Sequence, residues 1–138
     1  MDLVVSEGYY DIFYSQQKKI MLIRWKVKVL DLSLIEYKEI MFRAYEYLTI
    51  LDTDYLIQDG SDAVFPATLE ANDWIVKNIS PRFAQVGLKK IAYIIPRDDR
   101  TLEGLEKMVD KSLSVFPQVE RRLFPDIDKA MAWIKGNI

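Results

Sequence analysis

Four aspartates follow two apolar, strand-like runs of the chain, and they are the side chains best placed for chemistry. They are Asp59, Asp62, Asp98 and Asp99. Because the carboxyl ends of parallel strands share one edge of a sheet, the four carboxylates could converge there and hold a hard cation such as Mg²⁺ or Ca²⁺. Alternatively, the first pair forms a turn beside Gly60 and the second pair begins a helix. We favour turn and helix formation, so no metal site is predicted.

Other catalytic chemistry is restricted by composition, because the chain contains no cysteine and no histidine. Thiolate nucleophiles, the usual zinc sites and Ser-His-Asp hydrolysis are therefore excluded. A phosphoryl-acceptor role for Asp59 would need a lysine at the end of a later strand, but the run 119–124 is followed by Pro125. No two groups are spaced for acid and base roles. The sequence predicts a protein that is not an enzyme and needs no cofactor.

Length and charge indicate one domain over residues 1–138, with 19 basic and 21 acidic residues and a net charge of -2. This balance gives no basic surface for nucleic acid. No stretch approaches the roughly 20 apolar residues of a membrane span, and residues 1–7 lack the basic and apolar segments of a signal peptide. We expect a cytoplasmic protein, and the sequence leaves its oligomeric state open.

Strand patterns recur along the chain. Apolar or alternating runs predict strands at 9–14, 23–29, 55–57, 90–95 and 119–124, and residues 3–6 form either a strand of their own or an extension of the first. The first two of these runs predict an antiparallel hairpin. In the second, Ile23, Trp25, Val27 and Val29 alternate with Arg24, Lys26 and Lys28. The basic residues are expected on the solvated face, where they could alternatively meet an acidic partner.

Helix patterns separate these strands. Ser33 and Glu36 form a capping box that begins a helix with an apolar stripe to Leu51. Thr68 begins a second helix, which Ser80-Pro81 kinks or interrupts and Gly87 ends. A third helix spans 102–113, and Asp126 begins a fourth. The predicted fold is α/β, with a mixed sheet of four to five strands, mostly parallel after the N-terminal hairpin, packed by about four helices.

Aromatic residues are abundant, with three tryptophans, eight tyrosines and six phenylalanines. They could line an apolar pocket between the sheet and the helices, or they could simply fill the core, which is the commoner use. Trp25 and Trp74 are expected on inward faces, whereas Trp133 lies beside the apolar stripe of its helix. Phe65 lies in a loop, where an exposed apolar patch would suggest a partner surface.

Several segments together resemble the STAS-like domains related to anti-sigma-factor antagonists, especially small stand-alone bacterial members. The segments are YYDIFYSQQKKIMLIRWK, SLIEYKEI, LIQDG, DWIVKNISPRFAQVGLKKIAYIIP and FPDIDKAMAWI, which span nearly the whole chain. The resemblance is specific for fold and less so for activity. Antagonists of this family are switched by phosphorylation of a serine at a helix start. Here Thr68 begins that helix and Ser61 precedes it, but the D-S-S-G-L segment of the family is absent, which weighs against phosphoregulation.

The resemblance implies a non-catalytic protein-interaction or regulatory module that docks through the loop before the second helix. The residues assigned to this loop are Asp59, Ser61, Phe65 and Thr68, and those assigned to the neighbouring loop are Arg97, Asp98 and Asp99. Thr68 is either a phosphoacceptor or simply a helix cap. The alternative function is a small-ligand-binding domain, for a lipid or a nucleotide, with an apolar pocket between sheet and helices. The partner or ligand is not identified by the sequence.

Overall fold

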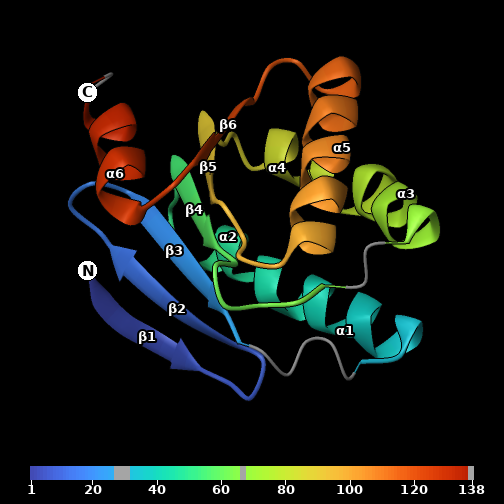
Figure 1. Ribbon diagram of the computed structural model, residues 1–138. Coiled ribbons are helices and arrows are strands. Elements are labelled where there is room, and N and C mark those ends of the chain that lie inside the picture. Colours follow the sequence, from blue (N-terminus) through green and yellow to red (C-terminus); the bar gives the residue numbers. More distant parts are fainter. Residues whose placement is uncertain (27–31, 66–67, 137–138) are drawn as a thin grey trace.

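The computed structural model describes residues 1–26, 32–65 and 68–136, which fold into one mixed sheet with helices on both faces (Figure 1). The six strands lie in the order in which they occur along the chain. They are β1 (Asp2–Ser6), β2 (Tyr10–Ser15), β3 (Ile20–Trp25), β4 (Tyr55–Asp59), β5 (Lys90–Ile94) and β6 (Glu120–Phe124). Strands β1 to β3 are antiparallel, and β3 to β6 are parallel.

The α/β class and the mixed sheet are confirmed, but the predicted count of four to five strands is wrong. Residues 2–6 form the additional strand β1, which pairs with β2 at one edge of the sheet. Four of its five residues are exposed, so no burial pattern marks it in the sequence. Strand β6 lies at the other edge, as its charged residues predicted. Strand β5 is buried along its whole length between β4 and β6, as its apolar sequence predicted.

Four helical segments pack on the sheet, and two of them are broken. The helices are α1 (Leu34–Tyr45), α2 (Tyr47–Ile50), α3 (Leu69–Asn78), α4 (Ser80–Gln85), α5 (Asp99–Val115) and α6 (Ile127–Lys135). Helix α6 covers one face, against β4 to β6, while the other helices cover the opposite face (Figure 1). No helix in the described ranges is long and apolar enough to cross a membrane.

The predicted helix ends are confirmed by their hydrogen bonds. The Ser33 hydroxyl accepts from the Glu36 N–H at 3.2 Å, and the Glu36 carboxylate accepts from the Ser33 N–H at 3.1 Å. Thr68 and Asp126 accept from backbone N–H groups one turn into their helices. Gly87 has a φ of 78°, the left-handed conformation that favours glycine after a helix.

Two helices predicted as continuous or merely kinked are divided. The segment from Ser33 to Leu51 changes direction at Glu46, between α1 and α2, although its apolar stripe continues without interruption. The second helix is interrupted at Ile79, and Pro81 takes one of the first positions of α4, where the missing N–H of proline costs no hydrogen bond.

The predicted strand at 23–29 is placed too late in the chain. Strand β3 covers Ile20–Trp25, and Val27, Lys28 and Val29 lie outside the described residues. Its first four residues are buried on both faces, because helices pack on each side of the sheet. Arg24 alone is exposed within the strand, as the alternation predicted.

Candidate functional site

The loops that leave β4 and β5 meet at the carboxyl end of the sheet. The Arg97 N–H donates to the Ser61 carbonyl at 3.1 Å, and the Arg97 guanidinium pairs with Asp62 at 2.7 Å. The Phe65 N–H donates to the Thr101 hydroxyl at 3.2 Å. Three contacts therefore join the loops, which confirms that the turns after these two strands share a rim.

The four aspartates at this rim do not converge on a common centre. The Asp59 carboxylate accepts from Arg24 Nε at 3.0 Å and from the Ser61 hydroxyl at 2.7 Å. Asp62 forms the surface ion pair with Arg97. Among the described residues, no cluster of three or more acidic side chains could hold a metal ion.

The second pair of aspartates begins helix α5. The Asp98 carboxylate accepts from the Thr101 N–H at 2.9 Å and from the Thr101 hydroxyl at 2.7 Å, and these hydrogen bonds hold the pKa of Asp98 below its ordinary value. Asp99 lies exposed in the first helical turn, where a carboxylate suits the helix dipole. The turn and cap interpretation of the aspartates is thus the one that the geometry supports.

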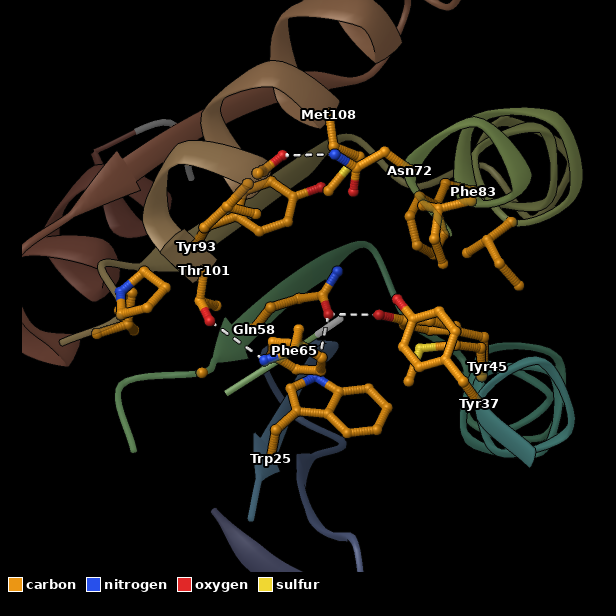
Figure 2. Close-up of a pocket in the computed structure, with 18 residues that line it drawn as sticks. Trp25, Tyr37, Tyr45, Gln58, Phe65, Asn72, Phe83, Tyr93, Thr101 and Met108 are labelled. Carbon is orange, nitrogen blue, oxygen red and sulfur yellow. Dashed lines mark hydrogen bonds between the residues drawn. The ribbon is translucent and has the colours of Figure 1, made fainter. Parts of the chain in front are cut away.

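Behind this rim lies a cavity of about 90 Å³, between the sheet and the helices α1, α3, α4 and α5 (Figure 2). Its lining is mainly aromatic and aliphatic: Trp25, Tyr37, Met41, Tyr45, Gln58, Gly60, Phe65, Asn72, Ile75, Ile79, Phe83, Tyr93, Ile94, Pro96, Thr101, Gly104, Leu105 and Met108. No carboxylate, lysine or arginine is among these residues. The cavity is therefore an apolar site with a few neutral polar groups, which is the usual composition of a small-molecule pocket.

Phe65 forms part of the cavity wall. Its ring packs edge-on against Trp25, with 5.6 Å between the ring centres, and the side chain is only partly exposed. Gly60 makes room for it, because a Cβ at position 60 would lie 3.2 Å from the Phe65 ring. The loop residue that was expected on a docking surface is thus turned toward the interior.

The polar groups of the cavity are centred on Gln58. Its side-chain oxygen accepts hydrogen bonds from the Tyr45 hydroxyl and from Trp25 Nε1, the latter at 3.4 Å (Figure 2). On the next strand, the Tyr93 hydroxyl accepts from Arg121 Nη1 at 3.3 Å. Burial raises the pKa of Tyr45 and of Tyr93 above the ordinary tyrosine value, so both phenols stay neutral and protonated near pH 7.

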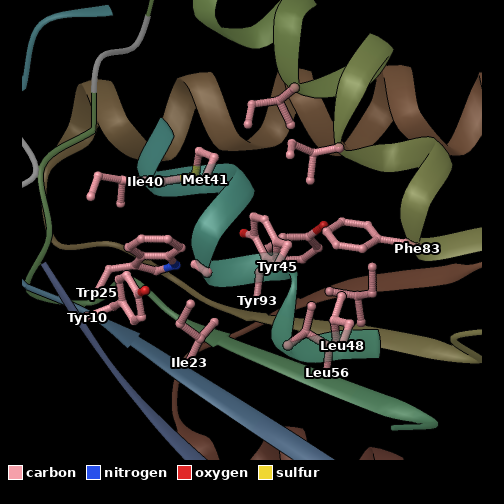
Figure 3. Close-up of a cluster of buried hydrophobic side chains, with 14 of the residues drawn as sticks. Tyr10, Ile23, Trp25, Ile40, Met41, Tyr45, Leu48, Leu56, Phe83 and Tyr93 are labelled. Atoms are coloured by element: carbon pink, nitrogen blue, oxygen red, sulfur yellow. The ribbon is translucent and has the colours of Figure 1, made fainter. Parts of the chain in front are cut away.

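The aromatic lining continues into the main core on this side of the sheet. Tyr45 and Phe83 meet edge-on with ring centres 5.1 Å apart, and Figure 3 shows both beside Tyr93 and Trp25 in the buried cluster. Trp74 and Trp133 do not line the cavity: Trp74 packs against Phe42 outside it, and Trp133 lies on the α6 face. Trp25 thus belongs to both the cavity lining and the buried core, whereas Trp74 and Trp133 are partly buried and pack against the core clusters.

Ser61 and Thr68, also predicted for the docking loop, form hydrogen bonds within the loop and at the start of α3. Ser61 donates its hydroxyl to Asp59, and Thr68 accepts from the Ala71 N–H at 3.1 Å as the cap of α3. Gln58, Tyr93 and Thr101 are not among the site residues predicted from the sequence. Gln58 had a detectable signal, since it lies two positions after Leu56 and so shares its inward face of β4.

Comparison of the chain with protein-family models, with curated proteins and with solved structures finds no match. The function is therefore inferred from the geometry of the cavity and of its rim.

Proposed function

We propose that this chain is a non-catalytic small-ligand-binding domain whose ligand enters the aromatic cavity at the carboxyl ends of β3, β4 and β5. The observation that carries this proposal is the cavity itself. Protein cores are packed with few voids larger than a water molecule, and a void needs only roughly 10–15 Å³ to hold one water. A space of about 90 Å³ with polar groups on one wall is suited to an organic ligand.

The lining indicates the kind of ligand. Trp25, Phe65 and Phe83 present aromatic surface, which favours a flat ring or a short apolar chain. Gln58 supplies the neutral polar group at the cavity floor. The volume suits a compound of about one ring better than a whole nucleotide or lipid, for which pockets of roughly 300 Å³ or more are usual.

The absence of ionised side chains from the lining supports a binding role over an enzymatic one. The titratable groups among the lining residues are tyrosines, and burial raises the pKa of Tyr37, Tyr45 and Tyr93. Such phenols are poor proton acceptors near pH 7. They can donate hydrogen bonds and orient a ligand.

Native mass spectrometry of freshly purified protein tests the proposal. We expect the wild type to retain a bound small-molecule mass that Met108→Trp loses, because the larger side chain fills the cavity. Val115→Trp is the matched control, since Val115 lies on the same helix at an exposed position outside the lining. A bare mass for all three proteins would contradict a ligand-binding role.

A STAS-like protein-interaction or regulatory role is a second proposal. One observation favours it: Leu69, directly after the cap Thr68, is 76% exposed at the start of α3. The inward position of Phe65 weakens it, because the loop then presents less apolar surface to a partner. A wild type that carries no ligand mass would make this second role the better supported of the two.

A further inference from the structure

Arg121 is a buried cation, and no counter-ion for it lies in the described part of the chain. It points from β6 into the main core and is only 4% exposed. Among the described residues, no carboxylate lies within ion-pair distance of it, and its single hydrogen bond runs from Nη1 to the Tyr93 hydroxyl. Nε and Nη2 are buried, and neither has a hydrogen-bond partner within the described ranges.

Lys90 on β5 is also a buried cation, but it has partners for its charge. Lys90 reaches the Trp133 carbonyl at 3.4 Å and pairs with Glu120 at 3.9 Å. An arginine keeps its charge at any ordinary pH, and a buried charge is costly unless it is paired and hydrogen-bonded. The environment of Arg121 thus lacks the negative group that a buried guanidinium requires.

The positions of the two unpartnered nitrogens indicate which kind of anion could pair with Arg121. Nε and Nη2 carry N–H groups along one edge of the planar guanidinium, and this edge binds both oxygens of a carboxylate side by side. A monoanion neutralises the single positive charge, whereas a dianion would leave one negative charge buried without a partner. The chemistry therefore favours a carboxylate over a phosphate monoester.

Arg121 adjoins the cavity through two lining residues. Its Nη1 donates to the Tyr93 hydroxyl, and its guanidinium carbon lies 5.5 Å from the centre of the Phe83 ring. Figure 2 shows the Tyr93 hydroxyl directed across the cavity toward Phe83. A ligand in the cavity with an acidic end directed between these two rings would bring its negative charge to the guanidinium.

Building on the proposed ligand-binding function, we propose that Arg121 recognises the acidic end of the ligand, which is a small monocarboxylate with an aromatic or short apolar body. Tyr93 takes part by accepting a hydrogen bond from Arg121 Nη1, which orients the guanidinium. In this arrangement the apolar body occupies the space beside Trp25 and Phe65.

Binding of two probes of matched shape, phenylacetate and phenylacetamide, tests this inference by ligand-observed NMR titration. We expect the wild type to bind phenylacetate about tenfold more tightly or better, since hydrogen bonds to a charged group exceed those to a neutral one. Met108→Trp should weaken the binding of both probes, which places them in the cavity.

Three arginine variants separate recognition from a structural role. Arg121→Met should bind both probes equally, and Arg121→Lys, which keeps the charge but loses the two-nitrogen edge, should lose most of the preference for phenylacetate. Arg122→Met is the matched control, because Arg122 lies on the α6 face beside Trp133 and should keep the full preference. Without ligand, Arg121→Met should melt at the same temperature as the wild type or higher, because an unpaired buried charge is removed.

The outcomes distinguish the two proposals. Equal binding of phenylacetate and phenylacetamide by the wild type would overturn the role of Arg121 but leave the cavity as a binding site. Binding of neither probe would overturn both. A preference that persists in Arg121→Met and Arg121→Lys would show that another group recognises the carboxylate, and would also overturn the inference.

Discussion

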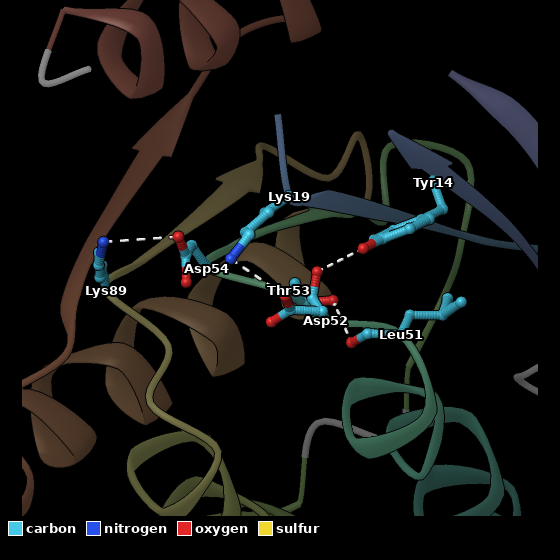
Figure 4. A network of polar contacts seen from close by, with 7 residues as sticks. All are labelled: Tyr14, Lys19, Leu51, Asp52, Thr53, Asp54 and Lys89. Carbon is cyan, nitrogen blue, oxygen red and sulfur yellow. Dashed lines mark hydrogen bonds and ion pairs between the residues drawn. The ribbon is translucent and has the colours of Figure 1, made fainter. Parts of the chain in front are cut away.

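The two ends of the parallel strands use polar side chains in contrasting ways. At the amino end, Lys19 pairs with Asp52 at 3.0 Å and Lys89 pairs with Asp54 at 3.4 Å, all near the surface (Figure 4). The Tyr14 hydroxyl donates to the Asp52 carbonyl beside them. At the carboxyl end, the side chains of Gln58 and Asp59 are buried.

This difference shows where a ligand could gain binding energy. Exposed ion pairs are screened by water and contribute little to stability, so the charged side chains at the amino end add little to the free energy of unfolding. Buried polar groups interact more strongly and cost more when unpaired, so their arrangement at the carboxyl end is specific. The apolar cavity beside these buried groups is therefore the basis of the proposed ligand-binding role.

The largest contrast is expected from removing one aspartate at each end. Asp59→Ala should lower the free energy of unfolding by about 2 kcal/mol, because Arg24 and Ser61 lose a buried charged acceptor. Asp52→Ala should change it little, since that side chain is exposed and its carbonyl still accepts from Tyr14. Urea denaturation followed by circular dichroism measures both. Similar losses for the two variants would contradict the contrast between the ends.

A smaller effect is expected from the neutral hydrogen bonds. Gln58→Met should destabilise the fold by about 1–2 kcal/mol, because the Tyr45 hydroxyl and Trp25 Nε1 would be buried without an acceptor. The double variant Gln58→Met with Tyr45→Phe should recover part of this loss, since one of the unpaired donors is then absent. At the amino end, Tyr14→Phe should have less effect than Gln58→Met in the same denaturation assay. The reverse order would show that Gln58 is not the acceptor on which the cavity wall depends.

The sequence predicted the rim better than the cavity behind it. Caps such as Ser33, Thr68 and Asp126 are local signals, and their hydrogen bonds were foreseeable from neighbouring residues alone. The meeting of the two loops followed from the rule that parallel strands end at the same edge. The sequence does not decide whether residues 3–6 form a strand of their own, because a strand exposed along most of its length shows no alternation of burial.

The cavity and Arg121 depend on packing between distant segments. A void arises where side chains from α1, α3, α4, α5 and the sheet fail to fill the space between them, and no single segment encodes that mismatch. In β6, Arg121 and Arg122 are adjacent, so the alternation alone does not show which of them faces the core. The charged residues of β6 correctly predicted an edge strand. They did not indicate that one of them, Arg121, is buried.

The smallest expected effects are opposite pH dependences at the two ends. The hydrogen bonds from Thr101 lower the pKa of Asp98 in the folded state, so Asp98 stabilises the fold above its unfolded pKa of about 3.9 and this contribution is lost as the pH falls through the folded pKa. The hydrogen bond to Asp52 raises the pKa of Lys19, so Lys19 stabilises the fold below about pH 10.4 and loses this effect as the pH rises through its folded pKa.

Two charge-removing variants separate these contributions. The difference in unfolding free energy between wild type and Asp98→Asn should be constant near neutral pH and shrink in acid, as the pH falls through the lowered folded-state pKa of Asp98. The difference for Lys19→Met should be constant near neutral pH and shrink as the pH rises through the raised folded-state pKa of Lys19. Urea titrations at a series of pH values measure both differences. A difference for Asp98→Asn that does not change in acid, or one for Lys19→Met that does not change in alkali, would contradict the hydrogen bonds assigned to Asp98 or Lys19.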